Sequence, residues 1–166
     1  PDHETVLCRD AARATSAAPT YFEPALIDVQ GSQRALIDGG VFVNSPVVSS
    51  YAEALKLFPA EPVAVVSLGT GELIRRIPYE SAKDWGQAGW VSPLIDCMFD
   101  GATKVANHQM RMFLGDHYFR LQVTLDEAND DMDDATAPNI QNLKRIAARM
   151  IAENRSTLDR VLDIVA

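Results

Sequence analysis

The chain has 166 residues, 47% of them hydrophobic, which is enough for one soluble domain to bury a core without disulfides or a structural metal. Its 15 Lys and Arg residues against 23 Asp and Glu residues give a formal net charge of −8. This charge disfavours nucleic acid as a partner, and the two isolated cysteines, Cys8 and Cys97, indicate neither a disulfide framework nor a zinc site and fit a reducing compartment.

Membrane and targeting signals are weak in this sequence. No apolar run approaches the roughly 18 residues that a spanning helix needs. Residues Pro1 to Asp10 lack the charged-then-apolar order of a secretory signal. We therefore expect a cytoplasmic location without a membrane anchor of the chain's own. The sequence begins with Pro1 and not with Met, which fits a natural start that lies elsewhere and fits processing of the chain equally well.

The first third of the chain predicts a short helix followed by a hairpin. Residues Arg9 to Ala18 are rich in alanine and are followed by Pro19, which predicts a helix that ends there. Two apolar-rich runs, Ala25 to Val29 and Gln33 to Ile37, flank Gly31-Ser32 and predict two strands of a hairpin. Asp38 then falls at the end of the second strand.

The next segment predicts a helix and then a buried strand. Asn44 or Ser45 can cap a helix that has Pro46 just inside it. Its predicted buried face consists of Val48, Tyr51 with Ala52, Leu55 and Phe58. The continuous apolar run from Pro62 to Leu68 predicts a strand covered on both sides, as in a parallel sheet between helices. This order of elements indicates an α/β layer fold.

The second half predicts one long helix, one strand and two covering helices. The helix is expected from about Pro93 to Phe113, and the alternating residues Tyr118 to Thr124 predict a strand. Apolar residues at helical spacing then predict two amphipathic helices, at Ile140, Leu143, Ile146, Ala147, Met150 and Ile151, and at Leu158, Val161, Leu162 and Val165.

An Asp-Gly-Gly tripeptide at the end of a predicted strand, Asp38-Gly39-Gly40, is the first candidate for chemistry. Glycines beside a carboxylate allow positive φ and leave space for a ligand or a second backbone. Alone, such a tripeptide is more often a turn than a site, because Asp-Gly pairs concentrate in turns.

Three further strings occur in order around this tripeptide. ARATSAAPTYF at residues 12–22 precedes it, Asn44-Ser45-Pro46 follows it, and SLGTG at residues 67–71 closes the next strand. Together they resemble the patatin-like phospholipase family. YFRLQ at residues 118–122 and the acidic stretch at residues 125–136 extend the resemblance over nearly the whole chain.

The resemblance implies a three-layer α/β fold with a mostly parallel sheet flanked by helices. Residues 1–166 would form the C-terminal portion of a single catalytic domain that cleaves lipid acyl esters with a serine nucleophile and an aspartate. The aspartate maps onto Asp38, with Gly39 and Gly40 as its neighbourhood. No cofactor is implied. The implied partners are a lipid acyl ester and, transiently, a membrane or micelle surface at which the enzyme is peripheral; the sequence indicates no particular oligomeric state.

The serine nucleophile of this resemblance is missing from the sequence. No two of the nine glycines are four residues apart, so a G-x-S-x-G elbow cannot be written here, and the glycine-rich oxyanion segment is also absent. We therefore expect that this chain alone hydrolyses nothing. The alternative is a non-catalytic lipid-binding or partner-docking module of the same fold, in which Asp38 is only a turn residue.

Three other residue patterns invite different chemistry. A histidine base is disfavoured because His3, His108 and His117 have no distinctive spacing to a serine. The turn at residues 69–71 lacks the motif that completes a phosphate-binding loop, which favours a tight strand-end turn. The acidic cluster fits no calcium-loop frame, which favours solvated residues that precede a helix, at Asp126, Glu127, Asp130, Asp131, Asp133 and Asp134.

Apolar residues between Ile77 and Met98 could line a path for the acyl chain. The segment contains both tryptophans of the chain, Trp85 and Trp90. Aromatic residues in such segments belong to a core more often than to a substrate path.

Overall fold

The structure, a computed structural model, describes residues 6–73 and 76–165. Helix α1 (Cys8–Thr15) is followed by the hairpin of β1 (Ala25–Val29) and β2 (Ser32–Leu36), and then by a 3-10 turn, η1 (Gly39–Val41). Strands β1 and β2 pair antiparallel and form the predicted hairpin, with Ala25 opposite Leu36. Helix α1 packs on this hairpin through a small core made of Ala14, Ala17, Ala25 and Ile27.

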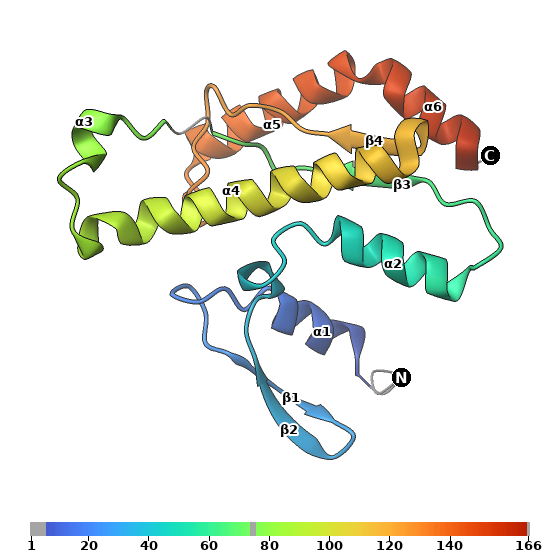
Figure 1. Cartoon of the computed structure of the whole chain (residues 1–166), viewed down its shortest axis with the longest axis horizontal. Coiled ribbons are helices and arrows are strands. Elements are labelled where there is room, and N and C mark those ends of the chain that lie inside the picture. The colour runs from blue at the N-terminus through green and yellow to red at the C-terminus, as the bar shows by residue number, and fades with distance from the viewer. Residues whose placement is uncertain (1–5, 74–75, 166) are drawn as a thin grey trace.

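The second part of the molecule is layered around two parallel strands. Helix α2 (Val47–Leu57) leads to β3 (Val65–Leu68), and the short helix α3 (Tyr79–Ala82) precedes the long helix α4 (Gln87–Leu114). A 3-10 turn, η2 (Gly115–His117), then leads into β4 (Tyr118–Leu121), which lies parallel to β3 with Val65 opposite Tyr118. Helices α5 (Ala137–Glu153) and α6 (Arg155–Val165) complete the described chain (Figure 1).

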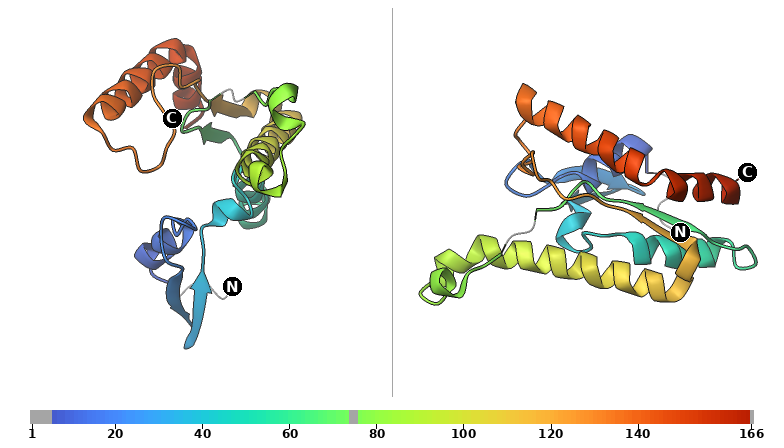
Figure 2. Two further views of the ribbon diagram at one scale, coloured as in Figure 1. Left: turned by 90° about the vertical axis from the view of Figure 1, so that its left-hand side faces the viewer. Right: turned by 90° about the horizontal axis from the view of Figure 1, so that it is seen from above.

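The predicted α/β class is confirmed. In the side view the parallel pair lies between α4 on one side and α5 with α6 on the other (Figure 2). In the described residues each of the two sheets has two strands. A core under α2 and α4 consists of Val47, Ala106, Met110 and Tyr118. No helix in the described part of the chain is long and apolar enough to cross a membrane.

The burial of the two parallel strands differs from the prediction. The β3 segment was expected to be covered on both sides, yet Val66 is 44% and Leu68 is 70% exposed. The β4 segment was expected to alternate, yet Tyr118 and Phe119 are both buried. Core residues beneath α4 cover Tyr118, and the Arg160 guanidinium of α6 lies 5.3 Å from the Phe119 ring centre. Strand β4 is therefore the covered member of the pair, because helices contribute side chains to both of its faces.

Several predicted helix boundaries were wrong for identifiable reasons. Helix α1 ends at Thr15, three residues early, because the Ser16 hydroxyl donates to the Ala12 carbonyl at 2.8 Å. Neither Asn44 nor Ser45 caps α2; its N-cap is Pro46, which has no side-chain cap bond. Helix α4 begins at Gln87, because Pro93 removes only one backbone donor and is accommodated inside the helix.

The predicted buried face of α2 is correct only in its first half. Val48 and Tyr51 pack against the core. Leu55 is 44% and Phe58 is 57% exposed, so the second half of this helix has an uncovered apolar face in the described structure.

Candidate active site

Asp38 lies two residues beyond the end of β2, where the hairpin pattern predicts it. Its backbone N–H donates to the Ala17 carbonyl at 2.9 Å, which ties the residue to the segment after α1. Its side chain is half-buried. The hairpin and α1 together therefore fix the backbone of Asp38.

The two carboxylate oxygens of Asp38 have different surroundings. Oδ1 accepts a hydrogen bond from the Gly40 backbone N–H at 2.6 Å, which makes Asp38 the N-cap of η1. Oδ2 accepts no hydrogen bond from any of the described residues. One oxygen is therefore used to orient the carboxylate, and the other is available to an incoming donor.

Of the two glycines after Asp38, Gly40 provides the close approach of a backbone that the sequence allows. Neither Gly39 nor Gly40 has a positive φ, so the left-handed backbone that glycine allows is not used here. A Cβ atom added at Gly40 would lie 3.0 Å from Asp38 Oδ1, whereas one at Gly39 would lie 3.7 Å from its nearest neighbour, Thr15 Oγ1. Glycine at position 40 therefore lets the backbone N–H approach the carboxylate closely.

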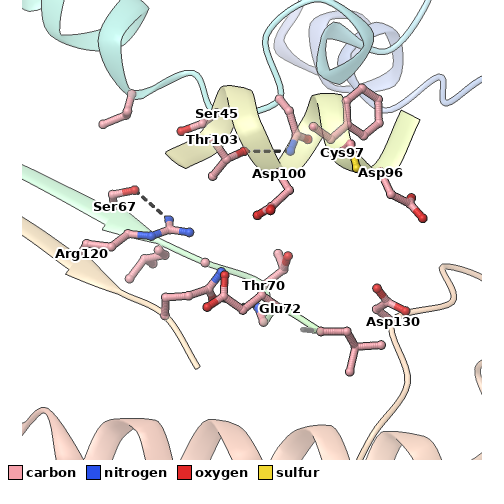
Figure 3. A pocket seen from close by; sticks show the side chains of 18 of the residues that line it. Ser45, Ser67, Thr70, Glu72, Asp96, Cys97, Asp100, Thr103, Arg120 and Asp130 are labelled. Carbon is pink, nitrogen blue, oxygen red and sulfur yellow. Dashed lines mark hydrogen bonds between the residues drawn. The ribbon is translucent and has the colours of Figure 1, made fainter. Parts of the chain in front are cut away.

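A cavity of about 900 Å³ opens at the C-terminal end of β3 (Figure 3). Its lining comes from the N-terminus of α2, the β3 end, the first half of α4 and β4. Ligands in open parallel sheets bind outside the carboxyl ends of the strands, and this cavity occupies that place. Asp38, Gly39 and Gly40 are not among its lining residues.

Asn44 connects the Asp38 turn to this cavity. It lines the cavity, and its Oδ1 would lie 3.7 Å from a Cβ atom at Gly40. Its Nδ2 donates to Thr103 Oγ1 of α4 at 3.1 Å. Asn44 therefore lies between the Asp-Gly-Gly turn and the cavity, and it is the residue that separates them.

The turn at residues 69–71 closes β3, as predicted. Gly71 has φ of +100°, a left-handed conformation that favours glycine, and a Cβ atom there would lie 2.5 Å from Leu125. The next residue, Glu72, forms an isolated parallel bridge with Thr124. The turn therefore leads into extended chain, which disfavours a phosphate-binding loop because such a loop opens onto a helix.

The cavity wall carries more carboxylates than guanidinium groups. Among the described lining residues, two arginines, Arg76 and Arg120, face four acids, Glu72, Asp96, Asp100 and Asp130. Asp100 also pairs with Lys104 at 2.7 Å, and this hydrogen bond raises the pKa of the lysine. Both signs of charge therefore occur among the described lining residues, and the charge of Asp100 is balanced by Lys104. No group of three metal-ligating side chains occurs in the described parts of the chain.

The expected acyl-lining segment is divided between the cavity wall and its surroundings. Ile77 and Trp85 line the cavity, whereas Trp90 does not. Trp90 instead makes an edge-to-face contact with Trp85, with ring centres 5.2 Å apart. Trp90 therefore supports Trp85 rather than forming the wall.

The two described histidines lie away from the cavity. His108 of α4 and His117 of η2 are both exposed, and neither lines the cavity. His3 is outside the described residues. The geometry of the described residues thus adds no support to a histidine base.

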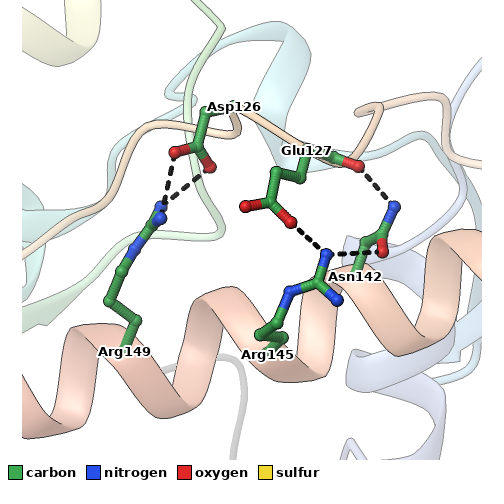
Figure 4. Close-up of polar contacts among 5 residues, drawn as sticks. All are labelled: Asp126, Glu127, Asn142, Arg145 and Arg149. Carbon is green, nitrogen blue, oxygen red and sulfur yellow. Dashed lines mark hydrogen bonds and ion pairs between the residues drawn. The ribbon is translucent and has the colours of Figure 1, made fainter.

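The acidic stretch binds the arginines of α5 (Figure 4). Asp126 accepts two hydrogen bonds from Arg149, at 2.8 and 3.0 Å, and Glu127 pairs with Arg145. The hydrogen bond from Arg149 lowers the pKa of Asp126 below its ordinary value. Near the start of α5, the Asp134 side chain accepts from the Thr136 N–H at 3.0 Å. These contacts explain Asp126 and Glu127 as attachments for α5 and place Asp134 at the start of this helix, which supports the helix-preceding interpretation over a calcium loop.

Sequence reasoning did not single out Arg120 and Gln122 as site residues, although both line the cavity. The sequence does show a cationic and an amide side chain in the otherwise apolar segment that pairs with β3. The parallel register places Arg120 opposite Ser67. This neighbour cannot be predicted from the β4 segment alone, because it depends on which strand pairs with it.

Comparison with curated proteins finds several relatives that are named as patatin-like proteins. The chain is 28% identical over 182 residues to patatin-like protein 4 of Arabidopsis thaliana, with 90% of this chain and 45% of the relative covered. It is 30% identical over 189 residues to patatin-like protein 1 of Oryza sativa subsp. indica, with 94% and 46% covered. The chain belongs to the patatin-like phospholipase family.

A bacterial relative of this patatin-like chain has a named activity. The chain is 30% identical over 127 residues to the cGAMP-activated phospholipase of Pseudomonas aeruginosa, with 73% of the chain and 37% of the relative covered. The chain spans less than half the length of the curated relatives that it matches. No family model matches the patatin-like chain, and no solved structure does.

Proposed function

We propose that this patatin-like chain is part of a lipid acyl hydrolase and supplies the general base of a Ser-Asp dyad, Asp38. The serine would come from a segment outside the printed sequence, because no G-x-S-x-G can be written within it. Residues 1–166 would then be the C-terminal portion of one catalytic domain. The relatives named as patatin-like proteins and as a phospholipase support a lipid ester as the substrate.

The environment of the Asp38 carboxylate carries this proposal. Oδ1 is held by the Gly40 N–H at 2.6 Å, while Oδ2 is left without a donor from the described residues. A general base needs both an orienting contact and a free lone pair within reach of the proton that it accepts. The half-buried position beside a cavity at the end of a parallel strand supplies the site for the reacting group.

The proposed reaction transfers one proton to Asp38 and back. Oγ of the serine attacks the ester carbonyl while Oδ2 of Asp38 accepts the hydroxyl proton, and the proton then passes to the leaving alcohol. A water molecule next attacks the acyl-enzyme carbonyl, gives its proton to Asp38, and releases the fatty acid when that proton returns to the serine. An ordinary Asp has a pKa of about 3.9, so strong stabilisation of the oxyanion and exclusion of water must assist so weak a base.

The substrate would reach the site from a lipid aggregate in the cytoplasm. The enzyme would contact a membrane or micelle surface transiently and peripherally. Ile77 and Trp85, which line the cavity, are the apolar side chains proposed to meet the acyl chain.

The decisive experiment substitutes Asp38→Asn in the full-length protein that contains this chain. We expect kcat to fall by about 100- to 10,000-fold, because an amide accepts no proton from the serine. Asp163→Asn, an exposed position on α6, is the matched control and should leave turnover unchanged. Hydrolysis of a soluble p-nitrophenyl ester and of phospholipid in mixed micelles provides the readout, and circular dichroism checks the fold.

Near-normal turnover of a folded Asp38→Asn protein would refute the dyad. An inactive wild-type protein that still sediments with lipid vesicles would instead favour the lipid-binding module. These two outcomes differ, so the experiment separates a wrong residue assignment from a wrong functional class.

A further inference from the structure

The turn at residues 69–71 is held to β4 and its continuation by three hydrogen bonds. The Gly69 N–H donates to the Leu121 carbonyl at 2.8 Å, and the Glu72 N–H donates to the Val123 carbonyl at 3.0 Å. Between them, the Gly71 N–H donates to the side-chain Oε1 of Gln122 at 3.1 Å. The turn that borders the cavity is therefore shaped by a side chain as well as by backbone pairing.

Gln122 occupies the space that a side chain at position 69 would need. Its Oε1 accepts from the Val123 N–H at 3.2 Å in addition to Gly71. A Cβ atom at Gly69 would lie 2.1 Å from this oxygen, which is far inside contact distance. Gly69 thus lets the glutamine amide lie directly under the turn and accept from its backbone.

Arg120 of β4 contacts the end of β3, immediately before the turn. Its Nη1 donates to Ser67 Oγ at 2.9 Å, and its Nη2 would lie 2.8 Å from a Cβ atom at Gly69. The side chain is half-buried and lines the cavity. Within the described part of the chain it forms no ion pair, so its visible contact is this structural one (Figure 3).

Thr70 is the residue of the turn whose polar groups remain unused. Its backbone N–H and its hydroxyl form no hydrogen bond with any described residue. The residue is exposed and lines the cavity, and its hydroxyl points toward the cavity in Figure 3. The Thr70 hydroxyl thus faces the cavity, and the Thr70 N–H is left without a hydrogen bond to a described residue while those of Gly69 and Gly71 are satisfied.

We propose that Thr70 is a substrate-binding residue whose hydroxyl donates to a neutral acceptor oxygen of the lipid ester. Gln122 and Arg120 are the positioning residues that hold Thr70 in place. This inference rests on the proposed function, because it takes the cavity to be the ester-binding site. It adds a binding contact that is separate from the proton transfer at Asp38.

The donors of Thr70 decide which acceptor it binds. Its hydroxyl is uncharged and forms no hydrogen bond with a described residue, so it suits an uncharged acceptor such as an ester carbonyl or a glycerol oxygen. Arg120 of the same wall donates to Ser67 through Nη1 at 2.9 Å. We therefore assign the Thr70 contact to the ester or glycerol region of the lipid.

The test compares Thr70→Val with Thr70→Ser in the full-length protein. Valine keeps the shape and the N–H but lacks the hydroxyl, whereas serine retains both donors. With a soluble p-nitrophenyl ester we expect Thr70→Val to raise KM about three- to tenfold at unchanged kcat, because one neutral hydrogen bond is lost from ground and transition states alike. Thr70→Ser should keep KM within about twofold. A Thr70→Val protein with wild-type KM would overturn the proposal.

The positioning role of Gln122 has its own conservative pair. Gln122→Glu keeps an acceptor oxygen for the Gly71 and Val123 N–H groups, and Gln122→Leu removes it. We expect the leucine variant to raise KM at least about tenfold, because two donors lose their partner and the turn relaxes. The glutamate variant should restore most of the affinity. Partial unfolding alone would lower the active fraction, and so the apparent kcat, with KM unchanged; that pattern would overturn the positioning role.

Measuring Asp38→Asn in the same assay separates the two proposals. If Asp38→Asn is inactive and Thr70→Val binds normally, only the Thr70 contact is wrong. If Asp38→Asn remains active while Thr70→Val raises KM, the cavity is the ester site and the dyad assignment is wrong.

Discussion

The side-chain amide of Asn44 donates to the hydroxyl of Thr103 at 3.1 Å across 59 residues of sequence. This contact joins the segment that follows the Asp38 turn to the middle of α4. Since Asn44 also lies beside Gly40 and lines the cavity, it is the link between the aspartate and the cavity wall.

Asn44→Ala and Thr103→Val should therefore be coupled. We expect each single change to lower the free energy of unfolding by about 0.5–1.5 kcal/mol, and the double change to cost less than the sum of the two. Urea unfolding followed by circular dichroism gives all four values of the cycle. Fully additive effects would show that the hydrogen bond contributes nothing measurable.

Gly40→Ala should disturb Asp38 without straining the backbone. Gly40 has no positive φ, so alanine is allowed there, but its Cβ would lie 3.0 Å from Asp38 Oδ1. We expect the carboxylate to shift and kcat of the full-length protein to fall about tenfold, as misplaced catalytic groups commonly cost. Gly39→Ala is the matched control, because its nearest neighbour lies at 3.7 Å and turnover should stay within about twofold. Equal losses in both variants would contradict the argument from Asp38 contact.

Met110→Ala should be the most destabilising methionine substitution in α4 that the structure identifies. Met110 is 0% exposed at the centre of the core under α2 and α4, whereas Met112, two residues later, is 73% exposed. We expect a loss of about 2–5 kcal/mol for Met110→Ala from lost burial and the cavity that remains. Met112→Ala should change the free energy of unfolding by less than about 0.5 kcal/mol. Chemical unfolding of both variants measures the difference, and similar values would show that the helix packs otherwise.

Local patterns predicted the hairpin, the position of Asp38 and the long helix, because each depends on neighbours in sequence. Asp38 follows β2 since the alternation of the hairpin ends there. The burial of β3 and β4 was predicted wrongly because it depends on which helices cover each strand, as the contact of Arg160 with Phe119 illustrates. The roles of Arg120 and Gln122 likewise depend on a partner strand about 50 residues away. The burial of the strands and the roles of these two residues both depend on tertiary contacts, which the pattern of a single segment does not reveal.

The pair of Asp126 and Arg149 predicts the pH dependence of stability. The hydrogen bond from Arg149 lowers the pKa of Asp126 in the folded chain, with a smaller contribution from the charge of Arg145. A lowered folded pKa stabilises the fold above the ordinary Asp pKa of about 3.9, and this contribution is lost as the pH falls through the folded pKa.

Asp126→Asn should therefore lower Tm slightly at pH 7, and the gap to wild type should close as the pH falls below about 3.9, because wild-type Asp126 becomes neutral as well. Thermal unfolding between pH 2.5 and 7 in low salt, at roughly half-unit steps, resolves the closure. Asp163→Asn, an exposed position on α6, controls for the loss of one negative charge. A gap that stays constant across this range would mean that the ionised Asp126 contributes no charge-dependent attachment of α5.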